Sequence, residues 1–321
     1  MMLRTVALFA ILLQIGSSLL MAQDYPTRPI TAIVPFAAGG TLDVFVRIIG
    51  DGISAKLKQP FIVLNRPGGN TVLGVAAGAK APPDGYTLTA IANGFTINAT
   101  LVRPLEYDSM EDFSPVAKLV STPHIFVVRS TLPVNSLAEF LDYAKRNSGK
   151  LTYGHFGVGT NSHITIERLK VLAKVEFTAV PYKGQAPATT DLLGGHVDMM
   201  AANLPDILPL VEARQLKALG VLTPVRLEEV PSLPTFEEVG FSGLTSETWF
   251  GLLAPARTPP AIIQQLYAAI SELLADRSIA EKIKARGMKL SVLGPSDFKS
   301  FLSEEIKKGA KIVEELKLRA P

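Results

Sequence analysis

The chain has 321 residues, of which 32 are Lys or Arg and 29 are Asp or Glu, and its formal net charge is +3. This near balance argues against a nucleic-acid partner, which usually requires a basic stripe on the protein surface. The chain contains no cysteine, which excludes disulfides, thiolate nucleophiles and lipid attachment through a cysteine.

Residues 1–22 have the pattern of a secretory signal peptide. Arg4 is the only charged residue before Asp24, and a long apolar run follows it. The length of this run suits a signal peptide better than a membrane span, and we expect cleavage near Ala22. An uncleaved membrane anchor is the alternative. In either case the sequence predicts an exported protein.

Beyond this leader, short apolar segments alternate with amphipathic ones. Strands are predicted at Thr31–Pro35, Phe61–Asn65, Thr87–Ala92, His124–Arg129, Leu151–Gly154, Phe177–Pro181, Met199–Ala202, Lys217–Val221 and Phe250–Ala254. Helices are predicted at Leu42–Lys58, Ser136–Asn147, Ser162–Ala173, Ala186–Leu193, Pro259–Asp276, Ile279–Arg286 and Ser296–Leu316. This alternation is typical of βαβ units, so we expect an α/β fold with mostly parallel sheets and helices on both faces.

Two breaks in composition, near residues 117–123 and 233–243, indicate that one domain is inserted into another. We expect a first domain of residues 24–120 plus 243–321 and a second domain of residues 121–242. Two chain crossings would then join the domains, and a ligand cleft is expected between them, at the carboxyl ends of the strands.

Six segments resemble, in order, the signature segments of one receptor family. They are YPTRPITAIVPFAAGGTLDVFVR at 25–47, NRPGGNTVLGVAAGAKAPPDGYTL at 65–88, YGHFGVGTNSHITIERL at 153–169, VPYKGQAPATTDLLGGHVD at 180–198, LPTFEEVGFSG at 233–243 and WFGLLAPARTP at 249–259. The chain is thereby similar to the Bug-type receptors, the periplasmic solute-binding proteins of tripartite tricarboxylate transporters. Val46, His155 and Phe156 are bulkier than the residues usual in the family, which leaves the ligand's identity open.

The resemblance implies a type II periplasmic-binding-protein-like fold with two hinged domains. It also implies a receptor in the periplasm that captures a small organic carboxylate and delivers it to membrane permease subunits. A dicarboxylate, an amino-dicarboxylate and an aromatic carboxylate are the ligand classes that we consider.

The Gly-rich turn after the first strand is the first candidate binding site. Its candidate residues are Phe36, Ala38, Gly39, Gly40 and Thr41. Backbone N–H groups at the start of a helix have no helical partner, and together with the Thr41 hydroxyl they suit a carboxylate. The alternative is a tight turn with Thr41 as the helix cap. Asp43 would repel an anion at this end, so we expect its carboxylate to point away and hold the loop.

A second Gly-rich loop precedes the predicted helix at 162–173. Its candidate residues are Gly159, Thr160, Asn161, Ser162 and His163. The resemblance places this loop across the cleft from the first one, and two facing helix ends would suit two carboxylates. The alternatives are helix capping by Thr160, Asn161 or Ser162 and a purely local role for His163.

Two further residues complete the candidate set. Asn93 follows a strand, where it either rims the pocket or forms an ordinary turn. Asp191 either accepts a hydrogen bond from an amine-bearing ligand or serves as a structural carboxylate.

An exported enzyme is the main competing interpretation, and a ligand sensor is another. The sequence contains neither a G-x-S-x-G elbow nor an H-E-x-x-H pattern, and His124, His155, His163 and His196 lack metal-ligand spacing. We therefore expect no catalytic residue, no metal and no cofactor, and we expect a monomer.

Overall fold

The computed structural model describes residues 25–320, so the predicted signal peptide lies outside the described residues. The strands are β1 (Ile30–Val34), β2 (Phe61–Asn65), β3 (Thr87–Ala92), β4 (Phe113–Arg129), β5 (Thr152–His155), β6 (Thr178–Pro181), β7 (Met199–Asn203), β8 (Leu216–Val221), β9 (Glu247–Pro255) and β10 (Lys289–Leu293). The helices are α2 (Thr41–Leu57), α3 (Val72–Ala79), α4 (Gly94–Leu101), α5 (Leu137–Arg146), α6 (Asn161–Ala173), α7 (Gln185–Gly194), α8 (Leu204–Glu212), α9 (Pro260–Ala275), α10 (Arg277–Lys284) and α11 (Pro295–Glu315).

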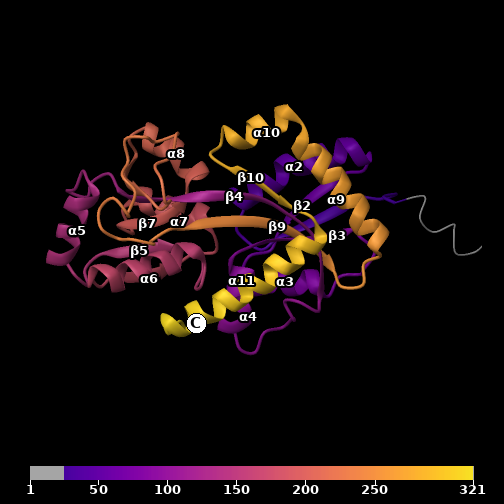
Figure 1. Ribbon diagram of the computed structural model, residues 1–321, viewed down its shortest axis with the longest axis horizontal. Coiled ribbons are helices and arrows are strands. Elements are labelled where there is room, and N and C mark those ends of the chain that lie inside the picture. The colour runs from indigo at the N-terminus through magenta and orange to yellow at the C-terminus, as the bar shows by residue number, and fades with distance from the viewer. Residues whose placement is uncertain (1–24, 321) are drawn as a thin grey trace, which may run out of the picture.

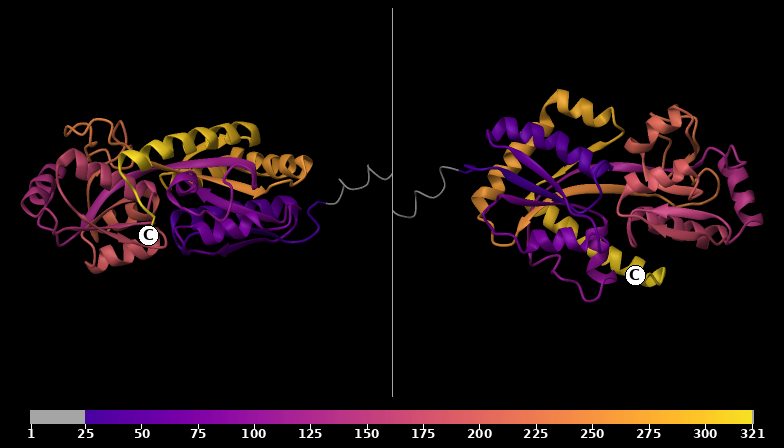
Figure 2. Two further views of the ribbon diagram at one scale, coloured as in Figure 1. Left: turned by 90° about the horizontal axis from the view of Figure 1, so that it is seen from below. Right: turned by 180° about the vertical axis from the view of Figure 1, so that it is seen from behind.

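These elements form two lobes, and β4 runs through both of them (Figure 1). In the first lobe the strand order is β2-β1-β3-β9-β4, and β10 pairs with β4. In the second lobe β4 pairs with β7 and β8, while β5 lies between β7 and β6. Figure 2 shows the two lobes from two further sides, with α11 lying along the first lobe and the C-terminus close to the second.

The sheets are mixed rather than mostly parallel. β1 pairs in parallel with β2 and β3, and β5 pairs in parallel with β6 and β7. All pairings of β4 and β9 are antiparallel. The reason is topological, because β4 leaves the first lobe for the second and β9 returns, so the two crossing strands run in opposite directions.

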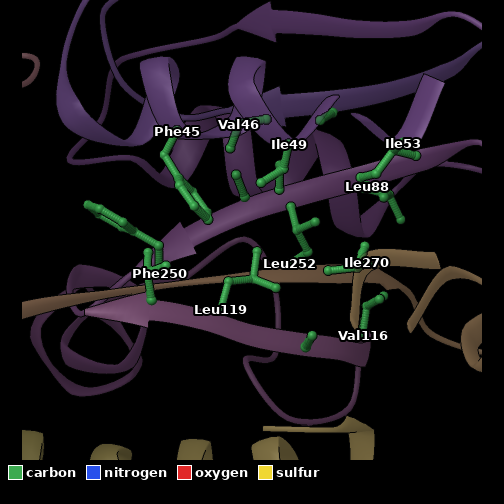
Figure 3. Close-up of a cluster of buried hydrophobic side chains, with 14 of the residues drawn as sticks. Phe45, Val46, Ile49, Ile53, Leu88, Val116, Leu119, Phe250, Leu252 and Ile270 are labelled. Atoms are coloured by element: carbon green, nitrogen blue, oxygen red, sulfur yellow. The ribbon is translucent and has the colours of Figure 1, made fainter. Parts of the chain in front are cut away.

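Helices cover both faces of the first-lobe sheet. On one face, Phe45 and Ile49 of α2 pack with Phe250 and Leu252 of β9, and all four are at most 2% exposed (Figure 3). The apolar residues of α2 recur every three or four positions, which places them on one side of the helix. On the other face, Trp249 packs against α11. Burial on both faces explains why β1 and β3 are mostly apolar.

The second lobe is built in the same way. α5 and α6 cover one face of its sheet, and α7 and α8 cover the other. Phe126 of β4 is fully buried, with its ring 4.8 Å from that of Phe140 and 5.5 Å from that of Phe236. Each lobe therefore has its own core, and the chain between the lobes is mainly β4 and β9.

The crossing of β4 is centred on His124. The strand pairs with β9 up to Pro123 and with β7 from His124 onward. The His124 ring is fully buried, with Nδ1 3.0 Å from the Ser246 hydroxyl and Nε2 2.8 Å from the Thr248 hydroxyl. Burial lowers the pKa of His124 to about 4, so the ring is neutral at physiological pH. The predicted domain boundaries at residues 120 and 243 stay a prediction.

Several predicted elements need correction. β4 starts at Phe113, whereas the prediction started it at His124. The prediction was late because Pro115, Lys118 and Ser121 interrupt the apolar pattern of the first half of the strand. The short helices α3, α4 and α8 and the strand β10 were not expected. Within residues 25–320, no helix is both long enough and apolar enough to cross a membrane.

The second-lobe core gives a direct stability test. We expect Phe126→Ala to lower the free energy of unfolding by about 3–5 kcal/mol, because the neighbouring aromatic rings cannot close the cavity. Val225, which is 72% exposed, provides the control substitution Val225→Ala, for which we expect little change. Urea denaturation measures both, and equal effects would contradict the assigned core.

Candidate functional site

A cavity lies between the two lobes and encloses about 500 Å³ of empty space, part of it open to solvent. It is lined by Phe36, Gly40, Thr41, Leu42, Asp43, Ala92, Asn93, Gly94, Phe156, Thr160, Asn161, Ser162, Gln185, Asn203, Thr248 and Phe250. The predicted site residues among them are Phe36, Gly40, Thr41, Asn93, Thr160, Asn161 and Ser162.

Five helices start at this cavity, namely α2 and α4 of the first lobe and α6, α7 and α8 of the second. In none of the five does the side chain of the N-cap residue accept from the first N–H groups, although at α2 the Thr41 N–H is accepted by Asp206. Of the helices that start elsewhere, α5 and α10 are capped by Ser136 and Asp276, whereas α3, α9 and α11 also start without a side-chain cap. The lining residues include no Lys or Arg in the described range. Backbone donors and helix dipoles without basic side chains are a lining that suits an anion.

At the start of α2, the chain holds the Gly-rich loop with its own carboxylate. Gly39 has a φ of +84° and donates its N–H to Asp43 Oδ2 over 2.9 Å. Arg47 and Asn65 donate to the same carboxylate. The expectation that Asp43 holds the loop is thus confirmed, whereas its expected orientation away from the ligand is not, because Asp43 lines the cavity. Burial would raise the pKa of Asp43, but the hydrogen bonds from Arg47, Gly39 and Asn65 outweigh it and lower the pKa.

The Thr41 hydroxyl is engaged across the cleft. It donates to Asp206 Oδ2 over 2.7 Å and accepts from Asn203 Nδ2 over 3.0 Å. Asp206 lies in the first turn of α8, and burial raises its pKa to about 6 in spite of hydrogen bonds from the Thr41 side chain and backbone. The expectation of a Thr41 hydroxyl free for a ligand carboxylate is therefore wrong in this structure.

At the start of α6, the hydroxyl groups also bond within the chain. Thr160 Oγ1 donates to the Gly157 carbonyl over 2.7 Å and lies 2.9 Å from Ser162 Oγ. Ser162 Oγ accepts the Phe156 N–H over 3.1 Å, and the Asn161 side chain donates to the Glu247 carbonyl. Because the single proton of Thr160 goes to Gly157, Ser162 donates to Thr160. What this end offers a ligand is therefore backbone N–H groups rather than hydroxyls.

Some predicted residues do not line the cavity. Ala38 and Gly39 lie on the exposed outer side of their loop. Gly159 faces Ile97 and Leu101 of α4, because its φ of +78° turns the loop toward that helix. For these positions the site prediction needs correction, since they shape loops rather than contact the cavity.

His163 and Asp191 also have local partners. His163 Nδ1 accepts the Gly159 N–H over 3.3 Å, and its ring packs against His155 with centroids 4.5 Å apart. Asp191 Oδ2 accepts from the Tyr182 hydroxyl over 2.6 Å. Both predicted contacts therefore need correction, and the local role considered for each residue is the one observed.

The two bulky residues at the end of β5, His155 and Phe156, lie in different surroundings. Phe156 lines the cavity, whereas His155 turns into the second lobe and is 1% exposed. Burial and the neighbouring His163 lower the pKa of His155 to about 4, which keeps it neutral. Gln185 is a lining residue that the sequence reading missed, and its position at the start of α7 was the available signal.

The loop carboxylate yields a prediction that depends on pH. We expect Asp43→Asn to lower the free energy of unfolding at pH 7 by about 1–3 kcal/mol, since hydrogen bonds to the charge are lost. Because the folded-state pKa of Asp43 is lowered, its stabilising effect is present above the usual Asp value of about 3.9 and is lost as the pH falls below it. Denaturation at pH 7 and pH 3 measures the free energy of unfolding of this variant. Asp51→Asn, which changes an exposed acid of the same helix, is the control. An equal loss at both pH values would contradict the assignment.

Comparisons with known proteins agree with this architecture. The family model of the tripartite tricarboxylate transporter family receptor matches residues 45–318. Protein BugT of Bordetella pertussis is 32% identical over 296 residues, which cover 92% of this chain and 91% of BugT. An uncharacterised-family protein encoded in the gbd 5' region of Cupriavidus necator is 34% identical over 297 residues, covering 92% and 90% of the two chains.

Solved structures show the same fold. Rpa4515 of R. palustris with adipate has a TM-score of 0.89 at 34% identity, covering 92% of this chain and 99% of that one. MatC of Rhodopseudomonas palustris with bound malate has a TM-score of 0.84 at 31% identity, covering 90% and 100%. The periplasmic binding protein BugD has a TM-score of 0.88 at 29% identity, covering 92% and 99%. The two-domain periplasmic-binding-protein fold is thereby confirmed, and the chain belongs to the Bug-type receptors of the tripartite tricarboxylate transporter family.

Proposed function

We propose that this receptor binds a small organic carboxylate in the cleft and delivers it to the membrane permease subunits of a tripartite tricarboxylate transporter. The observation that carries the proposal is the convergence of five helix starts on one cavity without a basic lining side chain in the described residues. None of the five is capped by the side chain of its own N-cap residue, and at α2 only the Thr41 N–H is accepted by another side chain, that of Asp206. Related structures contain adipate and malate, both carboxylates, which supports the ligand class.

The two lobes close around the ligand, and the permease subunits recognise this closed form. Contacts between the lobes include the Ala37 N–H donating to the Lys183 carbonyl over 2.8 Å and Asn70 Nδ2 donating to the Val158 carbonyl over 2.7 Å. These bonds form only while the lobes are together. A ligand that touches helix starts of both lobes adds contacts to the closed form alone, so it shifts the balance toward closure.

The proposed role is binding without chemistry on the ligand. The two carboxylates nearest the start of α2 are bonded within the chain, and His124 is buried and bonded on both nitrogens. The exported state of the chain and its periplasmic location are part of the proposal, in line with its family. A ligand sensor would use the same closure and would differ only in the membrane partner.

A thermal-shift screen tests the ligand class. We expect at least one aliphatic, amino or aromatic carboxylate to raise the melting temperature without being converted. A ligand at about 100 times its dissociation constant adds about 2.7 kcal/mol of stability. A folded protein that responds to no carboxylate, or that turns one over, would contradict the proposal.

The role of backbone donors can be tested at the first residue of α6. Proline fits this position, because Thr160 before it is extended and the first helical N–H has no helical partner. Asn161→Pro removes the side chain and the N–H, while Asn161→Ala removes the side chain alone. We expect the proline variant to bind the carboxylate about 10–100-fold more weakly than the alanine variant, the factor for one hydrogen bond to a charge. Titration calorimetry measures both, and equal affinities would exclude this N–H from the site.

A further inference from the structure

A second cavity lies in the cleft beside the one described above, which is called the inner cavity from here on. The outer cavity has about 530 Å³ of empty space, part of it open to solvent. It is lined by residues 35–36 and 68–71 of the first lobe and by residues 156–158 and 181–183 of the second. Both cavities are therefore formed where the two lobes meet.

Two phenylalanine side chains lie between these cavities. Phe36 and Phe156 are the only lining residues that the inner and outer cavities share within residues 25–320. Phe36 belongs to the loop after β1 of the first lobe, and Phe156 follows β5 of the second. A side chain that lines two neighbouring cavities separates them, so the two side chains form a partition across the cleft. Each lobe contributes one half of this partition.

Packing holds each half of the partition in place. Phe156 is 8% exposed and belongs to the core of the second lobe, and its N–H donates to Ser162 Oγ over 3.1 Å. Phe36 packs against the core of the first lobe. Its Cβ lies close to Gly184 of the second lobe, where an added Cβ would be 3.5 Å from it. Displacing either side chain would remove buried apolar contacts, so a ligand that extends from one cavity into the other has to overcome this cost.

The two cavities differ in the charge of their lining. Among the described residues, Asp43 is the only charged side chain lining the inner cavity, and Lys183 is the only one lining the outer cavity. The main chain of Lys183 is fixed at the lobe boundary, because its carbonyl accepts the Ala37 N–H over 2.8 Å. A ligand extending from the helix starts into the outer cavity would bring its far end near Lys183, whose ammonium attracts a carboxylate. Dicarboxylates of increasing length are therefore suitable probes of the partition.

We propose that Phe36 and Phe156 are specificity-determining residues that select the ligand by its length. They confine the ligand to the inner cavity, so the receptor takes a short carboxylate and rejects longer dicarboxylates, which would need the outer cavity and Lys183. This inference rests on the proposed function and deepens it, because it adds a limit of size to the ligand class.

A series of unbranched dicarboxylates from malonate to azelate, which grows by one methylene at a time, tests the partition. Titration calorimetry compares the wild type with Phe156→Ala. Beyond the length that the wild type binds most tightly, we expect its affinity to fall at least about tenfold within two methylenes, because one surplus methylene in a closed pocket costs about that factor. At that greater length, Phe156→Ala should bind at least about tenfold more tightly than the wild type.

Two further variants guard against a loss of folding. Phe36→Ala opens the same partition from the first lobe and should extend the accepted length in the same direction. Phe241→Ala removes an equal side chain that is partly buried in the second lobe and lines neither cavity, so it should leave the length profile unchanged. The melting temperature of each variant verifies that it is folded.

Lys183→Gln identifies the cavity into which a longer ligand extends. We compare its effect on the affinity of Phe156→Ala for the longer dicarboxylate with its effect on the affinity of the wild type for its own best ligand. The first effect should be about two- to fivefold larger, the range for an exposed ion pair. Equal effects would place the added length outside the outer cavity and would overturn the inference.

The outcomes separate the inference from the proposed function. If folded Phe156→Ala and Phe36→Ala bind no dicarboxylate longer than those that the wild type binds, the partition does not set the length and the carboxylate receptor stands. Absence of binding for every aliphatic, amino and aromatic carboxylate would overturn the proposed function itself.

Discussion

The first N–H groups of a helix have no acceptor within the helix, and in this receptor the starts of five helices line one cavity. The α/β fold makes this arrangement natural, because strands that end at the same sheet edge pass their chains to helices starting there. Elsewhere in the molecule, Ser136 and Asp276 cap α5 and α10 with their side chains, while α3, α9 and α11 start without a side-chain cap. At the cavity no N-cap side chain accepts from the first N–H groups of the described helices, and apart from the Thr41 N–H, which Asp206 accepts, these donors are what a carboxylate would satisfy.

The crossing strands decide how the two halves of this cavity meet. β4 and β9 carry the chain between the lobes, and His124 at the crossing is bonded to Ser246 and Thr248. Thr248 also lines the cavity, and Ser246 bonds to Thr165 of α6. Buried hydrogen bonds therefore connect the region where the lobes bend with the region where the ligand is proposed to bind. Polar groups buried in this way have to keep their partners, which favours a small number of defined lobe arrangements.

The sequence predicted the two Gly-rich loops because each combines a buried strand, small residues and a helix start within a few positions. It also predicted the local role of Asp43, since only four residues separate Asp43 from Gly39. The bond between Thr41 and Asp206 could not be predicted, because it joins residues 165 positions apart through the closure of the lobes. The same non-local pairing explains the late start predicted for β4, whose polar residues Lys118 and Ser121 become buried only against β9 and β10.

A crystal structure of the receptor with a carboxylate ligand tests the central claim most directly. The account predicts that both lobes contact the ligand and that its carboxylate oxygens lie within about 3 Å of backbone N–H groups at the start of α6 or α4. A carboxylate held instead by a lysine or arginine side chain, or bound outside the cleft, would contradict it.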